Sequence, residues 1–261
     1  MTTRKDSRQS TVSGEDEIRA EQKRKAETFR NLHWDAGSAK AVAEGGAKAI
    51  ATSSWSVAAA NGFVDGERIP LDLAINNLRR VASAVEVPVT VDLESGYGDA
   101  PNAVGMIVRM AIEVCAAGCN LEDSFPANGE LRKPCDQVDR IACARQVADE
   151  ANTRFFINAR TDVFFQRSAE HHDNTMLEEA IERARLYAEA GADGFFAPGL
   201  VDIHLIRRLV EASRLPVNVM VVDESPPVSI LAQNGVARVS YGPRPYLLAM
   251  KALEEAARAA I

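Results

Sequence analysis

Short apolar runs alternate with longer amphipathic stretches along the chain, and the junctions between them repeat. A helix-like segment ends in glycine and a short β-branched or aromatic run follows, as in EAGADGFFAPG and QNGVARVSYG. Glycine at a helix C-terminus takes the left-handed conformation that lets the chain turn back. Other runs enter through proline, as in VPVTVDLE and LPVNVMVV. The pattern predicts strands at residues 29–33, 48–54, 87–93, 118–123, 154–161, 193–198, 216–222 and 237–242.

A helical stretch follows each predicted strand. In NTMLEEAIERARLYAEAG, for example, Met176, Ala180, Ala184 and Tyr187 recur at helical spacing and form one apolar face. Eight β–α units in about 230 residues are typical of a (β/α)8, or TIM, barrel. A doubly wound open sheet is the alternative, but no glycine-rich nucleotide-binding motif follows an early strand. We therefore predict an α/β fold of the (β/α)8 barrel type.

The domain organisation follows from the same pattern. No interior linker is visible, so residues 17–261 are expected to form a single barrel domain. Residues 1–16 are polar and are expected to be a flexible N-terminal tail. From about Glu17 to Arg30, the many helix-forming residues with mixed charges predict an exposed helix.

Composition and charge exclude several classes of function. Of the 261 residues, 46% are hydrophobic and 26% charged, and the net charge of −7 is spread along the chain. Nucleic-acid binding requires a basic stripe, and a membrane span requires a long apolar run; neither is present in the sequence. The N-terminus lacks the apolar segment of a secretory signal. The four cysteines form no C-x-x-C pair, so we expect reduced thiols and a cytoplasmic protein.

Acidic side chains gather where predicted strands end. In VDLESGYGD, Asp92 and Glu94 share a face because strand side chains alternate. Glu122 and Arg160 end the next two strands, and Asp65 follows an earlier one. In a barrel these ends meet at the mouth, where active sites of this fold are built. Converging carboxylates repel each other unless a cation neutralises them, and oxygen ligands suit Mg²⁺ or Mn²⁺. Solvated or helix-capping acids, and an Arg160 that serves only in an ion pair, are the alternatives.

The same segments carry a family resemblance. The stretch NLHWDAGSAKAVAEGGAKAIATSSWSVAAANGFVDGE, followed by VDLESGYGD, NLED and NARTD, resembles the isocitrate lyase/phosphoenolpyruvate mutase superfamily over roughly residues 25–245. The resemblance implies a barrel that binds Mg²⁺ and a 2-oxo acid or its enolate. By family position, Asp92 would ligate Mg²⁺ directly, and Glu94 and Glu122 would hold its waters. It also implies a homotetramer in which the last helix is exchanged between neighbours.

The resemblance also implies which residues hold the substrate. Asp65 would lie close to the metal and the substrate, and Arg160 would bind the reacting end. Ser53, with the backbone amides of Ser54 and Trp55, would hold the substrate carboxylate.

The chain departs from both well-defined branches in the segment after the fourth predicted strand. The K-[KR]-C-G-H motif of the lyases is absent, and Cys135 follows RKP without the Gly-His. The mutase F-P-K loop is matched only in part by SFPAN, and Pro198 stands where the branches have His or Glu.

The loop itself, residues 123–136, is predicted to be mobile when empty and to close over ligand, because it contains Pro126, Gly129 and Pro134. Asn128, Glu130 and Arg132 are its candidates for contact with the departing group. Glu130 would exchange a proton and Arg132 would neutralise a second carboxylate.

The sequence thus predicts a Mg²⁺-dependent lyase that cleaves a C–C bond next to a 2-oxo or 2-hydroxy acid through an enolate. A 2-methylisocitrate-like or oxaloacetate-like substrate would suit it. The alternatives are C–P chemistry on a phosphonopyruvate-like substrate and a non-catalytic 2-oxo-acid-binding protein. The C-terminal segment RPYLLAMKALEEAARAAI predicts an amphipathic helix with Tyr246, Leu247, Met250 and Leu253 on one side. That helix either mediates the homotetramer or packs on its own barrel.

Overall fold

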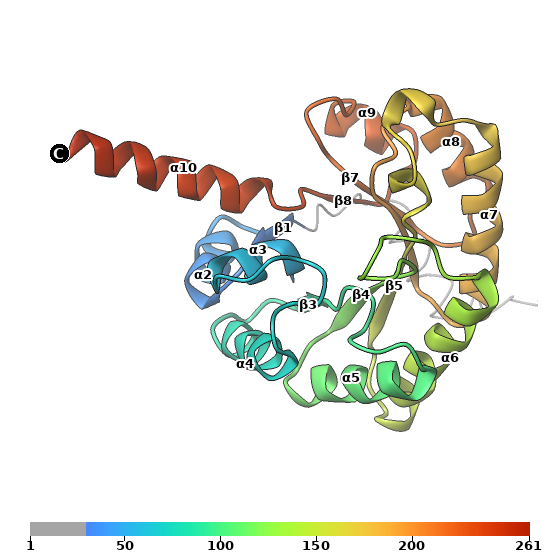
Figure 1. Cartoon of the computed structure of the whole chain (residues 1–261), viewed down its shortest axis with the longest axis horizontal. Coiled ribbons are helices and arrows are strands. Elements are labelled where there is room, and N and C mark those ends of the chain that lie inside the picture. Colours follow the sequence, from blue (N-terminus) through green and yellow to red (C-terminus); the bar gives the residue numbers. More distant parts are fainter. Residues whose placement is uncertain (1–29) are drawn as a thin grey trace, which may run out of the picture.

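The fold is a closed parallel barrel. The computed structural model describes residues 30–261, with side chains from His33 onward. Eight parallel strands form one sheet in sequential order, and β8 returns to lie against β1 (Figure 1). The strands are β1 (Arg30–His33), β2 (Ile50–Thr52), β3 (Val89–Asp92), β4 (Gly118–Glu122), β5 (Phe156–Arg160), β6 (Gly194–Ala197), β7 (Val217–Met220) and β8 (Arg238–Ser240). The predicted (β/α)8 architecture is confirmed.

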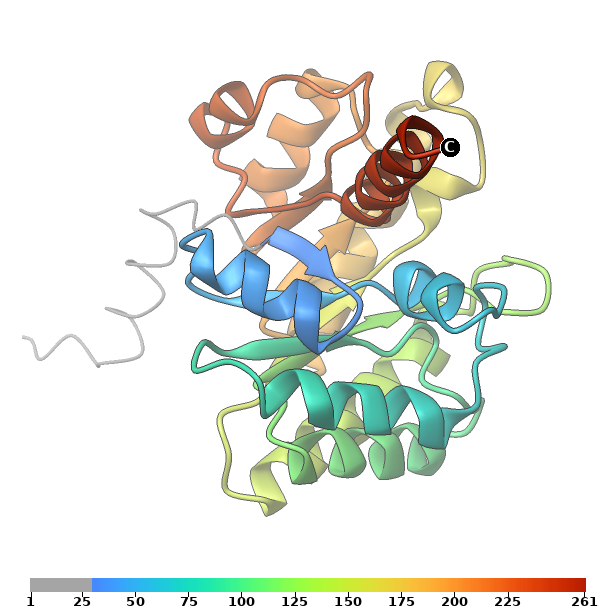
Figure 2. The same cartoon turned by 90° about the vertical axis from the view of Figure 1, so that its left-hand side faces the viewer.

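Helices follow the strands and cover the outside of the barrel (Figure 2). Within residues 30–261, none of them has the length and apolar composition of a membrane span. The α-helices are α2 (Ala36–Glu44), α3 (Ser54–Ala60), α4 (Leu71–Ala82), α5 (Pro101–Glu113), α6 (Pro134–Glu150), α7 (Asn174–Glu189), α8 (Ile203–Ala212), α9 (Val228–Gln233) and α10 (Arg244–Ala259). Two short 3-10 segments, Val163–Phe165 and Ala169–His171, lie between β5 and α7.

Every predicted strand is present but shorter than the sequence pattern suggested. The strand expected at 48–54, for example, ends at Thr52 because Ser53 is already the N-cap of α3. The serine side chain accepts a hydrogen bond from the Ser56 backbone N–H, which competes with extension of the strand. The predicted tail and nearly all of the helix expected from about Glu17 lie outside the described residues; Arg30 begins β1.

Apolar and polar side chains take opposite faces of the barrel wall. Between strands and helices lies one hydrophobic core, to which Leu78, Val108, Leu121 and Ile141 belong. The inside of the barrel is polar instead, with Asn120, Asn158, Asn218 and Arg238 all buried. The Asn158 amide donates to Asn120 Oδ1 at 2.8 Å. These side chains form a polar floor beneath the strand ends.

The last helix departs from the ring. Helix α10 projects away from the barrel and is seen almost along its axis after a quarter turn (Figures 1 and 2). None of its residues is buried. Its base is fixed by Tyr246, whose ring meets Trp34 edge-on at 5.0 Å and Trp55 at 5.9 Å. The alternative of a final helix packed along its own barrel is therefore wrong for this conformation.

Candidate active site

Asp92 lies at the end of β3 and is held from β2. Its backbone N–H donates to Thr52 Oγ1, and its Oδ2 accepts from the Ser54 hydroxyl at 2.9 Å and the Ser54 N–H at 3.2 Å. The other oxygen, Oδ1, is buried and has no hydrogen-bond partner among the described residues. An orphaned carboxylate oxygen is costly inside a protein unless a ligand or ion meets it.

Two further acids surround Asp92 from the neighbouring loops. Asp65 is open to solvent on one side, but partial burial and the charge of Asp92 raise the pKa of its carboxyl, while Ser54 hydrogen-bonds to it and opposes the rise. Glu94 is 3% exposed. Burial, followed by the charges of Asp65 and Asp92, raises the pKa of Glu94 to about 8. The predicted convergence of these acids is therefore present, although β3 ends before Glu94.

Arg160 is the cation of the mouth, and it is tightly held. Its Nη1 lies 2.7 Å from Glu122 Oε2, and its Nε lies 2.7 Å from Asp162 Oδ1. Burial alone would lower the pKa of the Arg160 guanidinium, but Glu122 and Asp162 outweigh it and raise that pKa. Ser124 links the two acids, since its hydroxyl lies 3.2 Å from Glu122 and 2.7 Å from Asp162. Burial also raises the pKa of Glu122, against the influence of Arg160.

The charge balance of this cluster fits a divalent cation. Among the largest electrostatic influences on Asp65, Glu94 and Glu122, Arg160 is the sole cationic side chain. In the described part of the chain, no three His, Cys, Asp or Glu side chains are arranged to coordinate one ion together. Mg²⁺ commonly takes one or two carboxylates and keeps several waters. The unpaired Asp92 oxygen is compatible with that mode.

The groups after β2 that were expected to hold a substrate carboxylate are partly engaged in other hydrogen bonds. The Ser53 hydroxyl interacts with Ser56 at the start of α3. The Ser54 N–H points at Asp92 rather than at open space. Trp55 is 36% exposed, and its ring lies 5.9 Å from that of Tyr246. Binding of a carboxylate by these groups stays a proposal, and it would require the Ser54 amide to leave Asp92.

The loop after β4 is folded and latched. Ser124 pairs with Leu131 across a short antiparallel bridge, and the Gln166 side chain donates to the Gly129 carbonyl. Arg132 is 3% exposed, and its Nη2 lies 2.8 Å from Asp99 Oδ1. Its guanidinium also stacks 4.0 Å from the Phe125 ring centroid.

The ligand contact expected of Arg132 stays a prediction. In this conformation Arg132 ties the loop to the β3–α5 segment through its ion pair with Asp99. Asn128 and Glu130 are exposed near the loop tip, where Asn128 Oδ1 accepts the Glu130 N–H. Cys135 is exposed at the start of α6. The site expected from sequence thus gathers the strand-end acids but not the loop residues.

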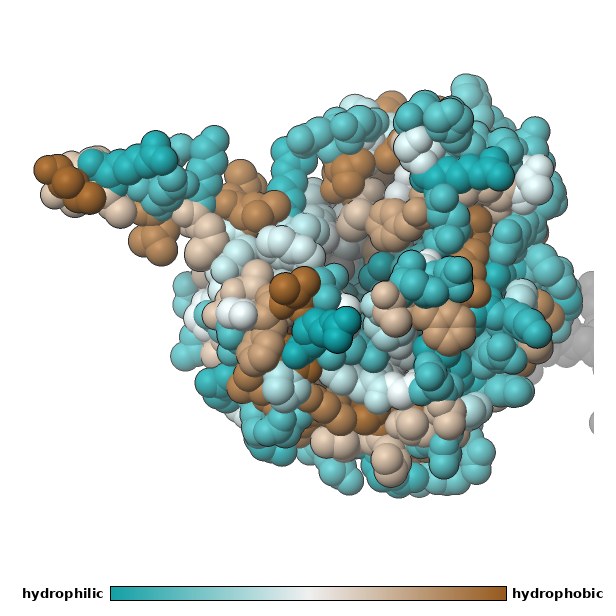
Figure 3. Space-filling view, in the orientation of Figure 1, coloured by the Kyte–Doolittle hydropathy of each residue, from teal (hydrophilic) through white to brown (hydrophobic). Residues whose placement is uncertain are grey.

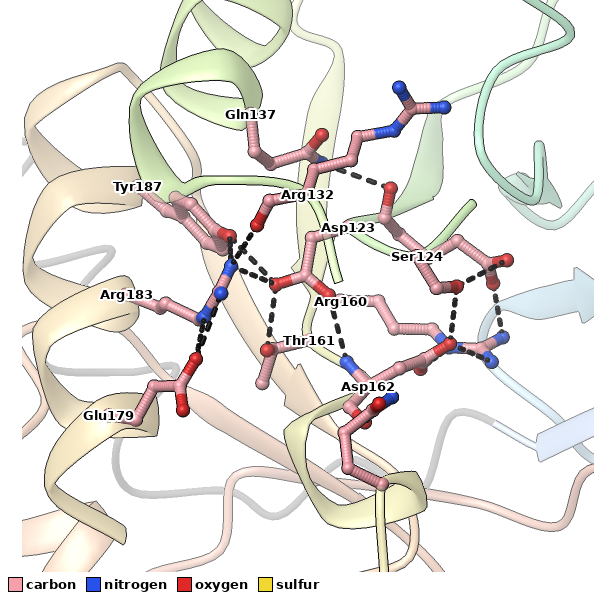
Figure 4. Close-up of polar contacts among 12 residues, drawn as sticks. Asp123, Ser124, Arg132, Gln137, Arg160, Thr161, Asp162, Glu179, Arg183 and Tyr187 are labelled. Atoms are coloured by element: carbon pink, nitrogen blue, oxygen red, sulfur yellow. Dashed lines mark hydrogen bonds and ion pairs between the residues drawn. The ribbon is translucent and has the colours of Figure 1, made fainter. Parts of the chain in front are cut away.

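A buried network behind Arg160 was not anticipated from the sequence (Figure 4). Asp123 is fully buried, and its carboxylate accepts from Thr161 Oγ1 at 2.7 Å and from the Asp162 N–H at 2.9 Å. From α7, Tyr187 donates to it at 2.7 Å and Arg183 at 3.1 Å. Asp123 therefore fixes the backbone of the residue that orients Arg160. The sequence held one sign of this network, because Arg183 interrupts the apolar face of α7.

Figure 3 shows a hollow near the centre of this face, and its rim carries both hydrophilic and hydrophobic residues.

Comparisons with known proteins agree on one family. The chain matches the family described as phosphoenolpyruvate phosphomutase over residues 21–261. An uncharacterized protein of Mycobacterium tuberculosis H37Rv is 36% identical over 228 residues, covering 87% of this chain and 81% of that protein.

Two further relatives carry functional descriptions. The 2-methylisocitrate lyase of Escherichia coli K12 is 31% identical over 180 residues, covering 66% of this chain and 57% of the lyase. A crystal structure from Burkholderia cenocepacia J2315, described provisionally as a phosphonomutase, is 53% identical with a TM-score of 0.88. It covers 93% of this chain and 98% of its own.

Proposed function

This chain belongs to the phosphoenolpyruvate phosphomutase family, within the isocitrate lyase/phosphoenolpyruvate mutase superfamily. From that premise, we propose that it is a lyase dependent on Mg²⁺ or Mn²⁺ that cleaves a C–C bond next to a 2-oxo or 2-hydroxy acid through an enolate. One observation carries the proposal: Asp92 presents a buried, unpaired carboxylate oxygen near Asp65, Glu94 and Glu122.

The cation would be held by Asp92 directly, with Glu94 and Glu122 holding its waters. When bound, it would supply positive charge to stabilise the negative charge that develops on the enolate oxygen. Burial, and after it the charges of neighbouring acids, raises the pKa of Glu94 and Glu122. A nearby cation would oppose both effects and favour the ionised carboxylates.

Arg160 is suited to bind the reacting end of the substrate. Its guanidinium is oriented by two carboxylates, so little reorganisation is needed when a substrate arrives. Because its pKa is raised, it stays charged across the physiological range. A planar arginine fork also matches the geometry of a carboxylate.

Proton transfer has two candidates. Asp65 faces solvent and has a raised pKa, which suits a group that takes up and gives back a proton. Glu130 would serve only after the loop tip moves inward, since it is exposed in this conformation. Arg132 acts in this proposal by holding the loop, in place of the ligand contact expected from sequence.

C–P chemistry is the second candidate, and it is favoured by the likeness to the Burkholderia cenocepacia structure described provisionally as a phosphonomutase. In that case Arg160 would meet phosphoryl oxygens, which a guanidinium also binds in a bidentate manner. The same acids would hold the cation.

A substrate panel tests these proposals. Methylisocitrate, dimethylmalate, oxaloacetate and phosphonopyruvate are each incubated with the protein in Mg²⁺ and in chelator, and products are followed by proton and phosphorus NMR. Cation-dependent formation of a 2-oxo acid from a carbon substrate supports the lyase, whereas a product that arises only from phosphonopyruvate supports C–P chemistry. Tight binding without turnover of any member would favour a non-catalytic binding protein.

A further inference from the structure

Two loops at the mouth are joined by a reciprocal pair of carboxylates. From the β3–α5 loop, Glu94 Oε2 accepts the backbone N–H groups of Gly66 at 2.9 Å and Glu67 at 2.6 Å. From the α3–α4 loop, Glu67 Oε1 accepts the Ser95 hydroxyl at 2.8 Å and the Tyr97 N–H at 2.7 Å. Each loop therefore supplies one carboxylate to the other. We call this arrangement the Glu67–Glu94 clasp.

Backbone strain is concentrated in the clasp. Five non-glycine residues among 30–261 have positive φ, and three of them belong to these loops: Glu67 (φ 58°), Glu94 (φ 53°) and Tyr97 (φ 51°). Side chains disfavour this left-handed region, and such conformations persist where surrounding contacts over-determine them. All three residues form clasp bonds: the Glu67 N–H donates to the Glu94 carboxylate, and the Tyr97 N–H donates to the Glu67 carboxylate. Without those bonds, the two loops would relax toward unstrained conformations.

One side of the clasp is rigid. Arg140, 1% exposed on α6, donates to the carbonyls of Gly98 at 2.6 Å and Asp99 at 2.7 Å, and also to that of Ser95. The β3–α5 loop is thus anchored to the helical layer from behind. Glu67 consequently ties the α3–α4 loop to a fixed support.

The tied loop carries Asp65. The Asp65 carboxyl directly precedes Gly66, whose N–H is one of the clasp donors, and it is close enough to Asp92 for that charge to raise its pKa. The same point meets the loop after β4: a Cβ placed on Gly66 would lie 3.5 Å from the Pro126 carbonyl oxygen. Displacement of the clasp would move Asp65 and disturb the packing of the third loop together.

We propose that Glu67 is a positioning residue that holds Asp65 near the Asp92 carboxylate by clasping the α3–α4 loop to the β3–α5 loop. The inference rests on the proposed function only for its effect on turnover; the clasp itself is a property of the fold. Because both of its bonds end on one oxygen, Oε1, an amide oxygen can accept them equally. The role requires the acceptor, not the charge.

Four variants test the clasp in the full-length protein. Glu67→Gln keeps the acceptor, Glu67→Ala removes it, and Ser95→Ala removes one of the two bonds. Glu86→Ala removes an exposed acid from the opposite end of β3 as the matched control. Circular dichroism verifies folding, and hydrogen exchange of residues 62–70, kcat and KM are measured for each.

We expect Glu67→Ala to accelerate exchange at residues 62–70 and to lower kcat by about 10- to 100-fold, as small displacements of catalytic groups do, with KM changed far less. Ser95→Ala should fall between it and wild type, while Glu67→Gln and Glu86→Ala should stay within about threefold of wild type. Equal damage from Glu67→Gln and Glu67→Ala would overturn the acceptor role. Unchanged hydrogen exchange in Glu67→Ala would also overturn the proposal. Faster exchange in Glu67→Ala with an unchanged kcat would do the same. Exchange needs no substrate, so a protein that turns over nothing would contradict the proposed function while this measurement still decides on the clasp.

Discussion

Asp92 is the residue on which the proposed chemistry depends. We expect Asp92→Ala to weaken Mn²⁺ binding by on the order of 100-fold or more, because the one unpaired buried oxygen of the cluster is lost. Asp162→Ala should keep Mn²⁺ affinity within a few-fold, since Asp162 contacts Arg160 and Ser124 instead. Electron paramagnetic resonance of free Mn²⁺ measures both. Equal Mn²⁺ affinities for the two variants would remove Asp92 from the cation site.

The buried His33 is expected to make the free energy of unfolding depend on pH. Its ring is 1% exposed, and neither nitrogen has a hydrogen-bond partner among the described residues. Burial lowers the pKa of His33 to about 4, with Asp35 acting weakly against it. The folded protein therefore binds fewer protons than the unfolded chain between pH 4 and 6.5. Across that window, His33 makes the free energy of unfolding rise with pH, by on the order of 3 kcal/mol in full.

The measurement compares urea unfolding of wild type and His33→Leu at pH 5 and pH 7. Other acids titrate in the same range, so the difference between the two proteins isolates His33. We expect wild type to lose more stability than His33→Leu when the pH falls. Identical pH dependence in both would show that His33 is not held neutral.

Site residues were predictable from sequence where they lie at the carboxyl ends of strands. Asp92, Glu122 and Arg160 end consecutive strands, and strand ends of a barrel must meet. Their partners were not predictable, because Arg183 and Tyr187 reach Asp123 from a helix some 60 residues away in sequence. Glu67 was missed for another reason: a left-handed glutamate leaves no signature in composition or spacing.

At the scale of elements, the latched loop after β4 is the part most open to test. Arg132→Ala removes the bond to Asp99 and the stack on Phe125, so cleavage by a protease near residues 127–129 should become several-fold faster. The loss should cost about 1–3 kcal/mol, because a buried guanidinium supplies packing as well as a charged hydrogen bond. Arg109→Ala is the control, since its pair with Glu150 is exposed and should change stability by less than about 0.5 kcal/mol. Unchanged cleavage in Arg132→Ala would contradict the latch.

The elements themselves were predictable to within a few residues. Glycine or proline before most strands and helical periodicity after them were sufficient for the architecture. The errors lie at ends such as Ser53, where a cap competes with the strand. The sequence pattern could not show where the loop side chains point. Arg132 looks like a mobile surface residue in sequence, and only the fold places Asp99 and Phe125 beside it.

At the scale of the whole molecule, α10 leaves large apolar side chains exposed. Leu247, Leu248 and Leu253 are 49%, 59% and 64% exposed on a helix that projects from the barrel. Burial of such side chains stabilises by about 1.5–3 kcal/mol each, which favours a partner for this helix. We expect a homo-oligomer, most simply the tetramer with exchanged C-terminal helices that the family resemblance implies.

Light scattering at micromolar concentration tests this expectation. Leu248→Glu with Leu253→Glu should shift wild-type oligomers toward monomers, while Glu254→Gln on the same helix should leave the mass unchanged. A monomeric wild-type protein would refute the oligomer.

In the proposed function, the mouth of the barrel binds an enolate together with a divalent cation. Oxalate is a planar dianion that resembles the enolate of pyruvate, and its binding is measured by titration calorimetry with Mg²⁺ and with chelator. We expect oxalate to bind wild type only when Mg²⁺ is present, and Asp92→Ala not to bind it under either condition. Oxalate binding that is equally tight in chelator, or unchanged in Asp92→Ala, would refute a cation-dependent enolate site.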